Sequence, residues 1–277
     1  MVIKMRVQPA SKKFIRRFLE VALSLLVSGT SMAADQVGAF GTSADQVGAF
    51  GTSAEKSLTT SWKHESELGI VNVSGNATSE SISAKQKTSY TFTDHTIVST
   101  ARYLNTRAAS SGGPEMDIAR SWEVTLRYEF SISEAVSPYG GLGAESDVFA
   151  GYVQKDNRDL GAKYIFFKDQ WFAEIGFRNS TVNAVGGGGV STINYGRLYT
   201  EYNQTLSEPV SLRLWTEYLP NFANSAGYLL NGEASVSVML NKIFSLKTAY
   251  LLRYNAGAVA PIATTDRTLT TTLVCKF

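Results

Sequence analysis

The amino-acid sequence predicts an all-β fold, a transmembrane antiparallel up-and-down β-barrel of about 12 strands. Three observations predict it: a leader typical of exported proteins, side chains that alternate between apolar and polar along most of the chain, and a terminal aromatic residue, Phe277. No stretch reaches the ~20 apolar residues that a membrane-spanning helix needs. Barrel strands alternate, so a barrel is compatible with a chain that is 44% hydrophobic and 18% charged.

The N-terminal segment, 1–33, has the organisation of a secretory signal peptide. A basic stretch is followed by an apolar core over 18–29 and then by small residues, Ser31 and Ala33. Signal peptidases recognise this order of basic, apolar and small residues. We therefore expect export and cleavage after Ala33, so that the mature chain begins at Ala34.

The formal net charge of +2 arises in this leader. Segment 1–33 holds six of the 26 basic residues and one of the 24 acidic residues, which leaves 20 basic and 23 acidic residues, a net charge of −3. A strongly basic chain would favour nucleic acid as a partner. The mature chain is slightly acidic, and we expect no nucleic-acid partner.

A tandem repeat follows the leader. The ten residues Ala-Asp-Gln-Val-Gly-Ala-Phe-Gly-Thr-Ser occupy 34–43 and recur identically at 44–53. Two such copies are too short and too polar to form a packed repeat array. We predict a flexible periplasmic tail over 34–60, followed by a barrel domain over 61–277.

The barrel domain shows a side-chain period of two. Within 121–130, for example, Trp122 and Leu126 share one face, whereas Glu123 and Arg127 share the other. This alternation is typical of strands that separate two environments. We expect strands near 62–73, 80–92, 96–106, 118–130, 137–146, 151–167, 171–181, 192–205, 210–219, 227–240, 243–254 and 266–277.

The connections between these strands alternate in length. Short connections are expected at 93–95, 131–136, 168–170, 206–209 and 241–242, and longer ones at 107–117, 182–191, 220–226 and 255–265. The short connection at 147–150 breaks the pattern. Short turns at one end and longer loops at the other are typical of outer-membrane barrels. The even strand count agrees with this interpretation.

Four segments resemble a known family. Trp62 to Asn76 contains an initial Trp, a Glu-Leu-Gly strand and a Ser-Gly-Asn turn, and similar segments follow at 145–152, 158–164 and 265–277. In this order they resemble the YdiY-like, salt-stress-induced outer-membrane proteins, a family defined by a domain of unknown function. The resemblance implies an outer-membrane barrel, inserted by the barrel-assembly machinery, which recognises a terminal aromatic residue such as Phe277.

The polar face of the strands carries charges of both signs. Candidate lumen charges are Glu123, Arg127, Glu129, Glu174, Arg178, Arg197, Glu201, Arg213, Glu217 and Arg253. We expect them to fill a narrow lumen as paired side chains, because a generous aqueous channel needs ~16 strands. A small, weakly selective pore is the alternative. The expected surroundings are outer-membrane lipids and lipopolysaccharide, and we expect a monomer.

Chemistry-bearing residues are sparse. The chain has two histidines, His64 on the outer face of the first strand and His95 in a short turn, and one cysteine, Cys275. None forms a recognisable catalytic or metal-binding motif. We predict no enzymatic activity, no cofactor and no metal, and a structural or stress-related role for the barrel. A passive diffusion channel and surface binding or adhesion through the loop at 182–191 remain alternatives.

Overall fold

The computed structural model describes residues 60–73, 77–110, 113–259 and 262–276. The predicted cleavage site at Ala33 and Ala34, the tandem repeat and the predicted assembly signal at Phe277 lie outside these residues. Within them, no helix is long and apolar enough to cross a membrane.

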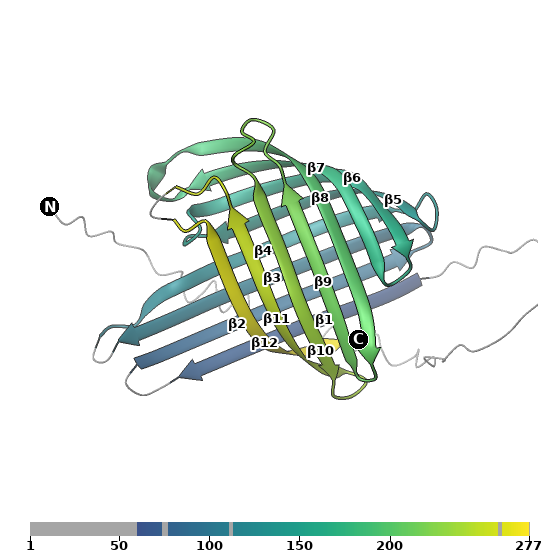
Figure 1. Ribbon diagram of the computed structural model, residues 1–277, viewed down its shortest axis with the longest axis horizontal. Helices are drawn as coiled ribbons and strands as arrows, with labels where there is room; N and C mark the ends of the chain where they lie inside the picture. Colours follow the sequence, from purple (N-terminus) through teal and green to yellow (C-terminus); the bar gives the residue numbers. More distant parts are fainter. Residues whose placement is uncertain (1–59, 74–76, 111–112, 260–261, 277) are drawn as a thin grey trace, which may run out of the picture. The chain divides into compact units, whose positions relative to one another are not determined.

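Twelve antiparallel strands form a closed barrel in which sequence neighbours pair with one another and β1 pairs with β12 (Figure 1). The strands are β1 (Thr60–Val73), β2 (Ala77–Phe92), β3 (His95–Ser110), β4 (Met116–Phe130), β5 (Val136–Asp147), β6 (Tyr152–Phe167), β7 (Trp171–Ala184), β8 (Val190–Ser207), β9 (Val210–Leu219), β10 (Leu229–Met239), β11 (Phe244–Asn255) and β12 (Thr265–Lys276). A short 3-10 turn, Val185–Gly187, precedes β8. The predicted fold class is confirmed.

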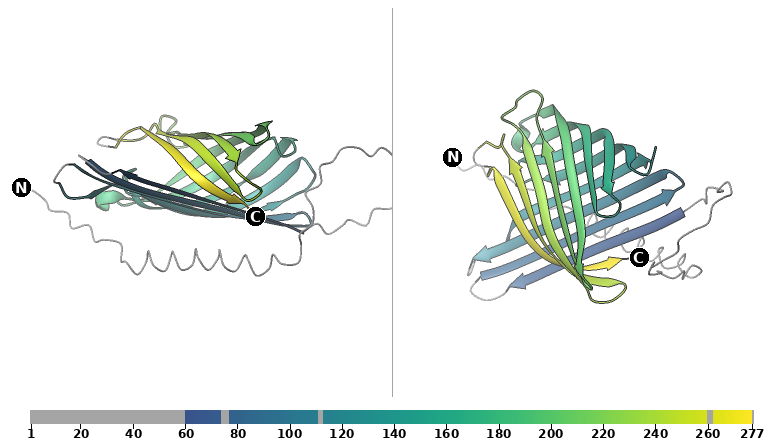
Figure 2. Two further views of the ribbon diagram at one scale, coloured as in Figure 1. Left: turned by 90° about the horizontal axis from the view of Figure 1, so that it is seen from below. Right: turned by 45° about the vertical axis from the view of Figure 1, so that its right-hand side comes forward.

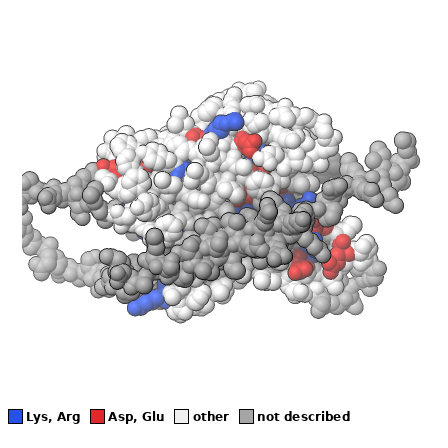
Figure 3. All heavy atoms as spheres, turned by 180° about the vertical axis from the view of Figure 1, so that it is seen from behind, with Lys and Arg blue, Asp and Glu red and all other residues white. Residues whose placement is uncertain are grey.

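The barrel is polar inside and apolar outside. Successive side chains of a strand point to opposite faces, and residues paired on neighbouring strands share a face. On β4, Ser121 is 7% exposed, whereas Leu126 is 54% exposed. Figure 3 shows one side of the outer wall, where the described atoms are mostly uncharged. A water-soluble protein has the opposite arrangement, with its apolar side chains inside.

The two ends of the barrel differ. Short connections lie at one end, called the turn end, at 93–94, 131–135, 168–170, 208–209 and 240–243. The other end, called the loop end, is where β3 is followed by β4, β5 by β6, β7 by β8, β9 by β10 and β11 by β12. About half of each of two predicted loops, 107–117 and 182–191, is strand, because Arg107 pairs with Asp117 and Val182 pairs with Ser191. Strand pairing requires only backbone hydrogen bonds, so these hairpins extend beyond the apolar alternation that predicted them.

Aromatic side chains gather near both ends of the outer wall. At the turn end, ring contacts connect Trp62, Tyr90, Phe92, His95, Tyr128 and Phe130 across β1 to β4. At the loop end, Tyr228 contacts Tyr218 and Tyr254. His95, which we predicted in a turn, is the first residue of β3 and belongs to this turn-end belt.

The pairing that closes the barrel is short. Among the described residues, β1 and β12 share four residue pairs, from Glu65 with Lys276 to Leu68 with Leu273, whereas other neighbouring strands share at least nine. Toward the loop end, β1 continues with β2 and β12 continues with β11, and the two strands diverge (Figure 2). Closure therefore depends on the middle of β1, from Glu65 to Leu68.

Candidate functional site

The lumen holds the densest group of charged side chains in the described chain. All ten predicted lumen charges form ion pairs there: Glu123, Arg127, Glu129, Glu174, Arg178, Arg197, Glu201, Arg213, Glu217 and Arg253. Several of these pairs join strands that are not neighbours in the wall, which requires both side chains to point into the barrel. Most of these ion pairs fall into three clusters, and Arg213 pairs with Glu201 at 2.7 Å.

The central cluster is built around Glu174 on β7. Its carboxylate accepts hydrogen bonds of 2.9 and 2.7 Å from the Arg127 guanidinium of β4 and one of 2.5 Å from Arg197 of β8. Arg197 also donates to Glu217 at 2.7 Å, and Arg178 reaches Glu217 at 3.3 Å. Glu174 is 5% exposed and Arg197 7%. Buried charges are tolerated only where they are paired in this way.

Tyr139 of β5 lies between Arg127 and Arg197. The Arg127 guanidinium carbon is 3.7 Å from the centre of the tyrosine ring, and Arg197 donates to the Tyr139 hydroxyl at 2.7 Å. Gly161 and Gly176 pair with each other beside the ring. A Cβ on either would lie within 2.7 Å of the Tyr139 hydroxyl oxygen, so their lack of side chains makes room for it.

A second cluster lies beside the closing strands. Lys247 Nζ of β11 is 2.8 Å from Glu67 of β1 and 3.4 Å from Glu233 of β10. Lys85 of β2 reaches Glu233 at 3.4 Å across the lumen. Because β2 and β10 are separated by three strands, this pair also bridges the interior.

The third cluster lies toward the loop end. Arg102 pairs with Glu123 at 2.9 Å and Lys155 with Glu145 at 2.9 Å. Arg253 of β11 approaches Asp147 of β5 at 3.9 Å. Together the three clusters place paired charges along much of the lumen.

Several members of this network were not among the predicted site residues. Asp159 forms two 2.7 Å hydrogen bonds with Arg178, and Glu145 holds Lys155. The alternation of side chains could have placed Asp159 on the inward face, because it lies four residues from the inward-facing Lys163 on the same strand. Tyr139 carried no comparable signal, because only the fold brings it between two arginines.

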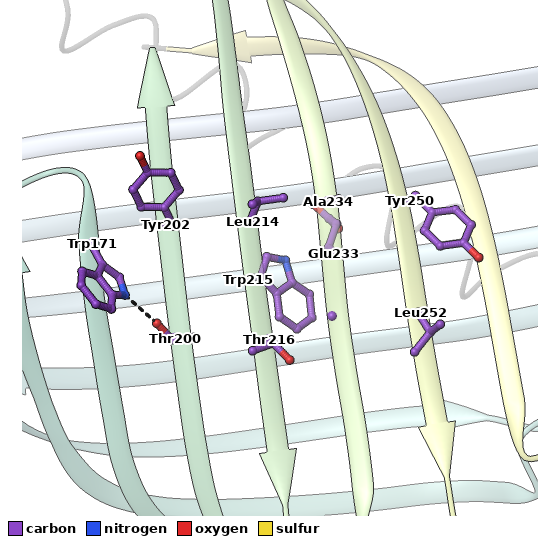
Figure 4. Close-up of a pocket in the computed structure, with 11 residues that line it drawn as sticks. Trp171, Thr200, Tyr202, Leu214, Trp215, Thr216, Glu233, Ala234, Tyr250 and Leu252 are labelled. Atoms are coloured by element: carbon purple, nitrogen blue, oxygen red, sulfur yellow. Dashed lines mark hydrogen bonds between the residues drawn. The ribbon is translucent and has the colours of Figure 1, made fainter. Parts of the chain in front are cut away.

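The outer wall carries a shallow hollow of 410 Å³ over β7 to β11 (Figure 4). Its rim includes Trp171, whose indole nitrogen donates to Thr200 at 3.0 Å. Small residues, Gly232 and Ala234, form part of its floor. Its lining is mostly apolar, so this hollow suits packing against apolar chains and offers no chemistry.

The two histidines lie on the outer wall. His95 Nδ1 is 2.7 Å from the Tyr128 hydroxyl in the aromatic belt. His64 Nε2 is 2.8 Å from Ser66 Oγ, and His64 Nδ1 is 2.8 Å from Thr88 Oγ1. Sequence reasoning missed this His–Ser contact, although residues two apart on a strand share a face. Within the described ranges, no group of three His, Cys, Asp or Glu side chains is arranged to hold a metal ion.

A family described as a protein of unknown function, DUF481, matches residues 66–277. The match confirms the resemblance predicted from the sequence, which was to a family of unknown function. No curated protein matches the chain.

Solved structures with a similar chain trace are β-barrels of outer membranes. The NanC porin has 8% identity, covers 78% of this chain and 98% of its own, with a TM-score of 0.44. The translocator domain of the autotransporter NalP from Neisseria meningitidis has 9% identity, 96% and 97% coverage and a TM-score of 0.42. An outer-membrane channel from Pseudomonas putida F1 has 12% identity, 83% and 99% coverage and a TM-score of 0.42. Similarity at this level carries no conclusion about function.

Proposed function

The chain belongs to the DUF481 family of proteins of unknown function, and on that premise we propose that it is an integral outer-membrane protein with a largely closed lumen. In this proposal the barrel crosses the bilayer, and its own ion pairs close the interior to general diffusion. Its role is structural, in line with the predicted structural or stress-related duty.

The outer wall supports a place in a membrane. Lipid offers no hydrogen-bond partners, so only helices and closed barrels cross a bilayer. Exposed apolar side chains cover the middle of the wall, among them Leu160 at 68% and Leu269 at 70% exposure. Aromatic belts near both ends suit the two membrane–water interfaces. Both features are costly in water and favourable in lipid.

The contact between Arg127 and Glu174 carries the proposal of a closed lumen. It joins β4 to β7 through the interior, and Arg197 of β8 joins the same carboxylate. A wide diffusion pore keeps its lumen open, with charges along the wall. Here charges from opposite walls hold one another, which favours a filled interior.

Planar-bilayer recordings of the purified full-length protein test this proposal. We expect few or very small conductance steps, and larger steps from a variant that carries Arg127→Ala and Arg197→Ala. Arg107→Ala is the matched control, because its ion pair with Asp117 lies in the loop-end extension and is more exposed. Large steps from the unchanged protein, unaltered in the double variant, would contradict the closed lumen.

A narrow channel is the second candidate function. Lys87 on the inward face of β2 is exposed, and no described carboxylate lies within ion-pair distance of it. An exposed lysine inside the barrel indicates water beside it. Small anion-selective steps that lose selectivity in Lys87→Gln would favour this candidate over the fully closed lumen.

Membrane lipids, lipopolysaccharide and the barrel-assembly machinery are the partners that this proposal implies, with the protein as a monomer. A folded barrel of this kind resists detergent and migrates differently on a gel before and after boiling. We expect such a shift, with the protein in the outer-membrane fraction. Deletion of Phe277 should reduce the folded fraction, whereas fractionation as a soluble protein would refute the proposal.

A further inference from the structure

A polar patch interrupts the apolar outer wall on β1 to β3. His64 and Ser66 of β1 lie two residues apart, and Thr88 and Gln86 of β2 pair with them in that order. The His64 ring is 2.8 Å from both Ser66 Oγ and Thr88 Oγ1, and the Gln86 side-chain amide donates to Thr88 Oγ1. Four side chains thus form one hydrogen-bonded chain on the outside of the barrel.

The order of groups in this chain is that of an activated serine. A hydroxyl becomes a nucleophile when a histidine accepts its proton and a third group fixes the imidazole through its other nitrogen. His64 contacts Ser66 through Nε2 and Thr88 through Nδ1. With the ring hydrogen on Nδ1 donated to Thr88, Nε2 is left to accept the hydroxyl proton of Ser66.

The patch lies next to the turn-end aromatic belt. Trp62 pairs with Tyr90, His64 pairs with Thr88 in the next outward-facing row, and Ser66 with Gln86 in the row after that. Leu68 continues the wall and is 52% exposed. In a bilayer, aromatic belts lie at the headgroup level. The nucleophile then lies just inside that level, where the ester bonds of membrane lipids lie.

We propose that Ser66 and His64, with His64 positioned by Thr88, form the catalytic group of a lipid-ester hydrolase on the outer wall of the barrel. The proposal goes beyond the function proposed above and shares with it only the premise that this wall faces lipid. Its substrate class is an ester-linked membrane lipid, presented to the site from the bilayer.

The reaction proceeds in two balanced steps. Ser66 Oγ attacks the ester carbonyl carbon while His64 Nε2 takes the hydroxyl proton, and the tetrahedral intermediate collapses as His64 returns that proton to the leaving alcohol. Water then attacks the acyl-serine with His64 again as base, releasing the fatty acid and restoring Ser66. The sum is ester plus water giving acid plus alcohol.

Gln86 is placed to stabilise the intermediate. It lies directly opposite Ser66 in the β1–β2 pairing, and one amide hydrogen goes to Thr88. The other amide hydrogen donates to the oxyanion that forms beside Ser66. Removing one such donor from a hydrolase typically lowers kcat by ~10²-fold or more. Thr88 acts through His64 and is a positioning residue.

The test uses full-length protein refolded into phosphatidylcholine vesicles. We expect release of free fatty acid, and covalent attachment of a fluorophosphonate probe to Ser66, located by mass spectrometry of the unaltered protein. Ser66→Ala and His64→Ala should abolish both signals. Thr88→Ala should lower kcat, and Thr88→Ser should restore most of it, because it keeps the accepting hydroxyl.

Ser99→Ala is the matched control. Ser99 faces outward on β3 and pairs with Thr88, and it is not one of the four side chains of the hydrogen-bonded chain. Its loss should leave hydrolysis unchanged. Folding of each variant is read independently from the gel shift on boiling. A folded, vesicle-inserted protein without hydrolysis or labelling overturns this inference alone, as does full activity in Ser66→Ala. A protein that does not enter vesicles refutes the proposed function instead.

Discussion

Arg127 on β4 and Glu174 on β7 meet through two hydrogen bonds of 2.9 and 2.7 Å, although β5 and β6 lie between them in the barrel wall. Glu174 also binds Arg197 at 2.5 Å. One carboxylate thus pairs with two guanidinium groups that both contact Tyr139. Because Glu174 serves both arginines, its loss affects two ion pairs at once.

Glu174→Gln should therefore destabilise the barrel. It removes one charge and leaves the buried Arg197 and the partly buried Arg127 facing a neutral amide, and breaking a buried pair costs about 3–5 kcal/mol. Because Glu129 and Glu217 remain beside these arginines, we expect about 3 kcal/mol, the low end of that range. Urea unfolding in vesicles measures it. Glu80→Gln, an exposed change on the outer face of β2, should alter stability little; equal effects of the two changes would argue against the network.

Tyr139 depends on the paired glycines beside it. In Gly161→Ala the new Cβ would lie 2.4 Å from the Ile175 carbonyl oxygen and 2.6 Å from the Tyr139 hydroxyl oxygen. The ring must then shift and its hydrogen bond with Arg197 breaks. Overpacking of this kind costs about 1–3 kcal/mol.

The matched control is Gly140→Ala on β5, where the nearest atom to the new Cβ is 3.9 Å away. It should unfold at nearly the urea concentration of the unchanged protein, whereas Gly161→Ala should unfold earlier. Similar midpoints for the two variants would show that the space beside Tyr139 is not needed.

The sequence predicts the barrel well because alternation is a local property. The strand over 210–219 was predicted with its observed ends, and the others differ by a few residues. Alternation also assigns each charge to a face, so inward residues such as Arg127 were found. Backbone pairing between strands requires no alternation of side chains, so the sequence pattern does not reveal it. The extra strand residues Ser110 and Val190 were therefore predicted as loop.

Contacts across the lumen were beyond such reasoning. Which carboxylate meets Arg127 depends on barrel closure and on the register between strands, and Glu174 is 47 residues away. The contact between His64 and Ser66 was missed for a different reason. Their spacing was visible in the sequence, but without the β1–β2 register nothing connected them to Thr88 as a third member.

Three of the four tryptophans allow a direct test of which face of the wall meets lipid. Trp62 of the turn-end aromatic belt, at 58% exposure, lies on the outer wall, and so does Trp171 at 38%, which stacks on Phe166 at the turn end of β7. Trp215 pairs with the inward-facing Glu233 and stacks on Tyr199 at 5.9 Å between ring centres.

In single-tryptophan variants, with the others replaced by Phe, brominated phospholipids should quench the fluorescence of Trp62 and Trp171. Bromines near the headgroup should quench more than those deep in the acyl chains, because aromatic belts lie at the interface. Trp215 should be quenched least, since the barrel wall separates it from the acyl chains. Quenching of Trp215 equal to that of Trp62 would mean that the inward and outward faces are misassigned, and both the lumen network and the outer-wall site would lose their basis.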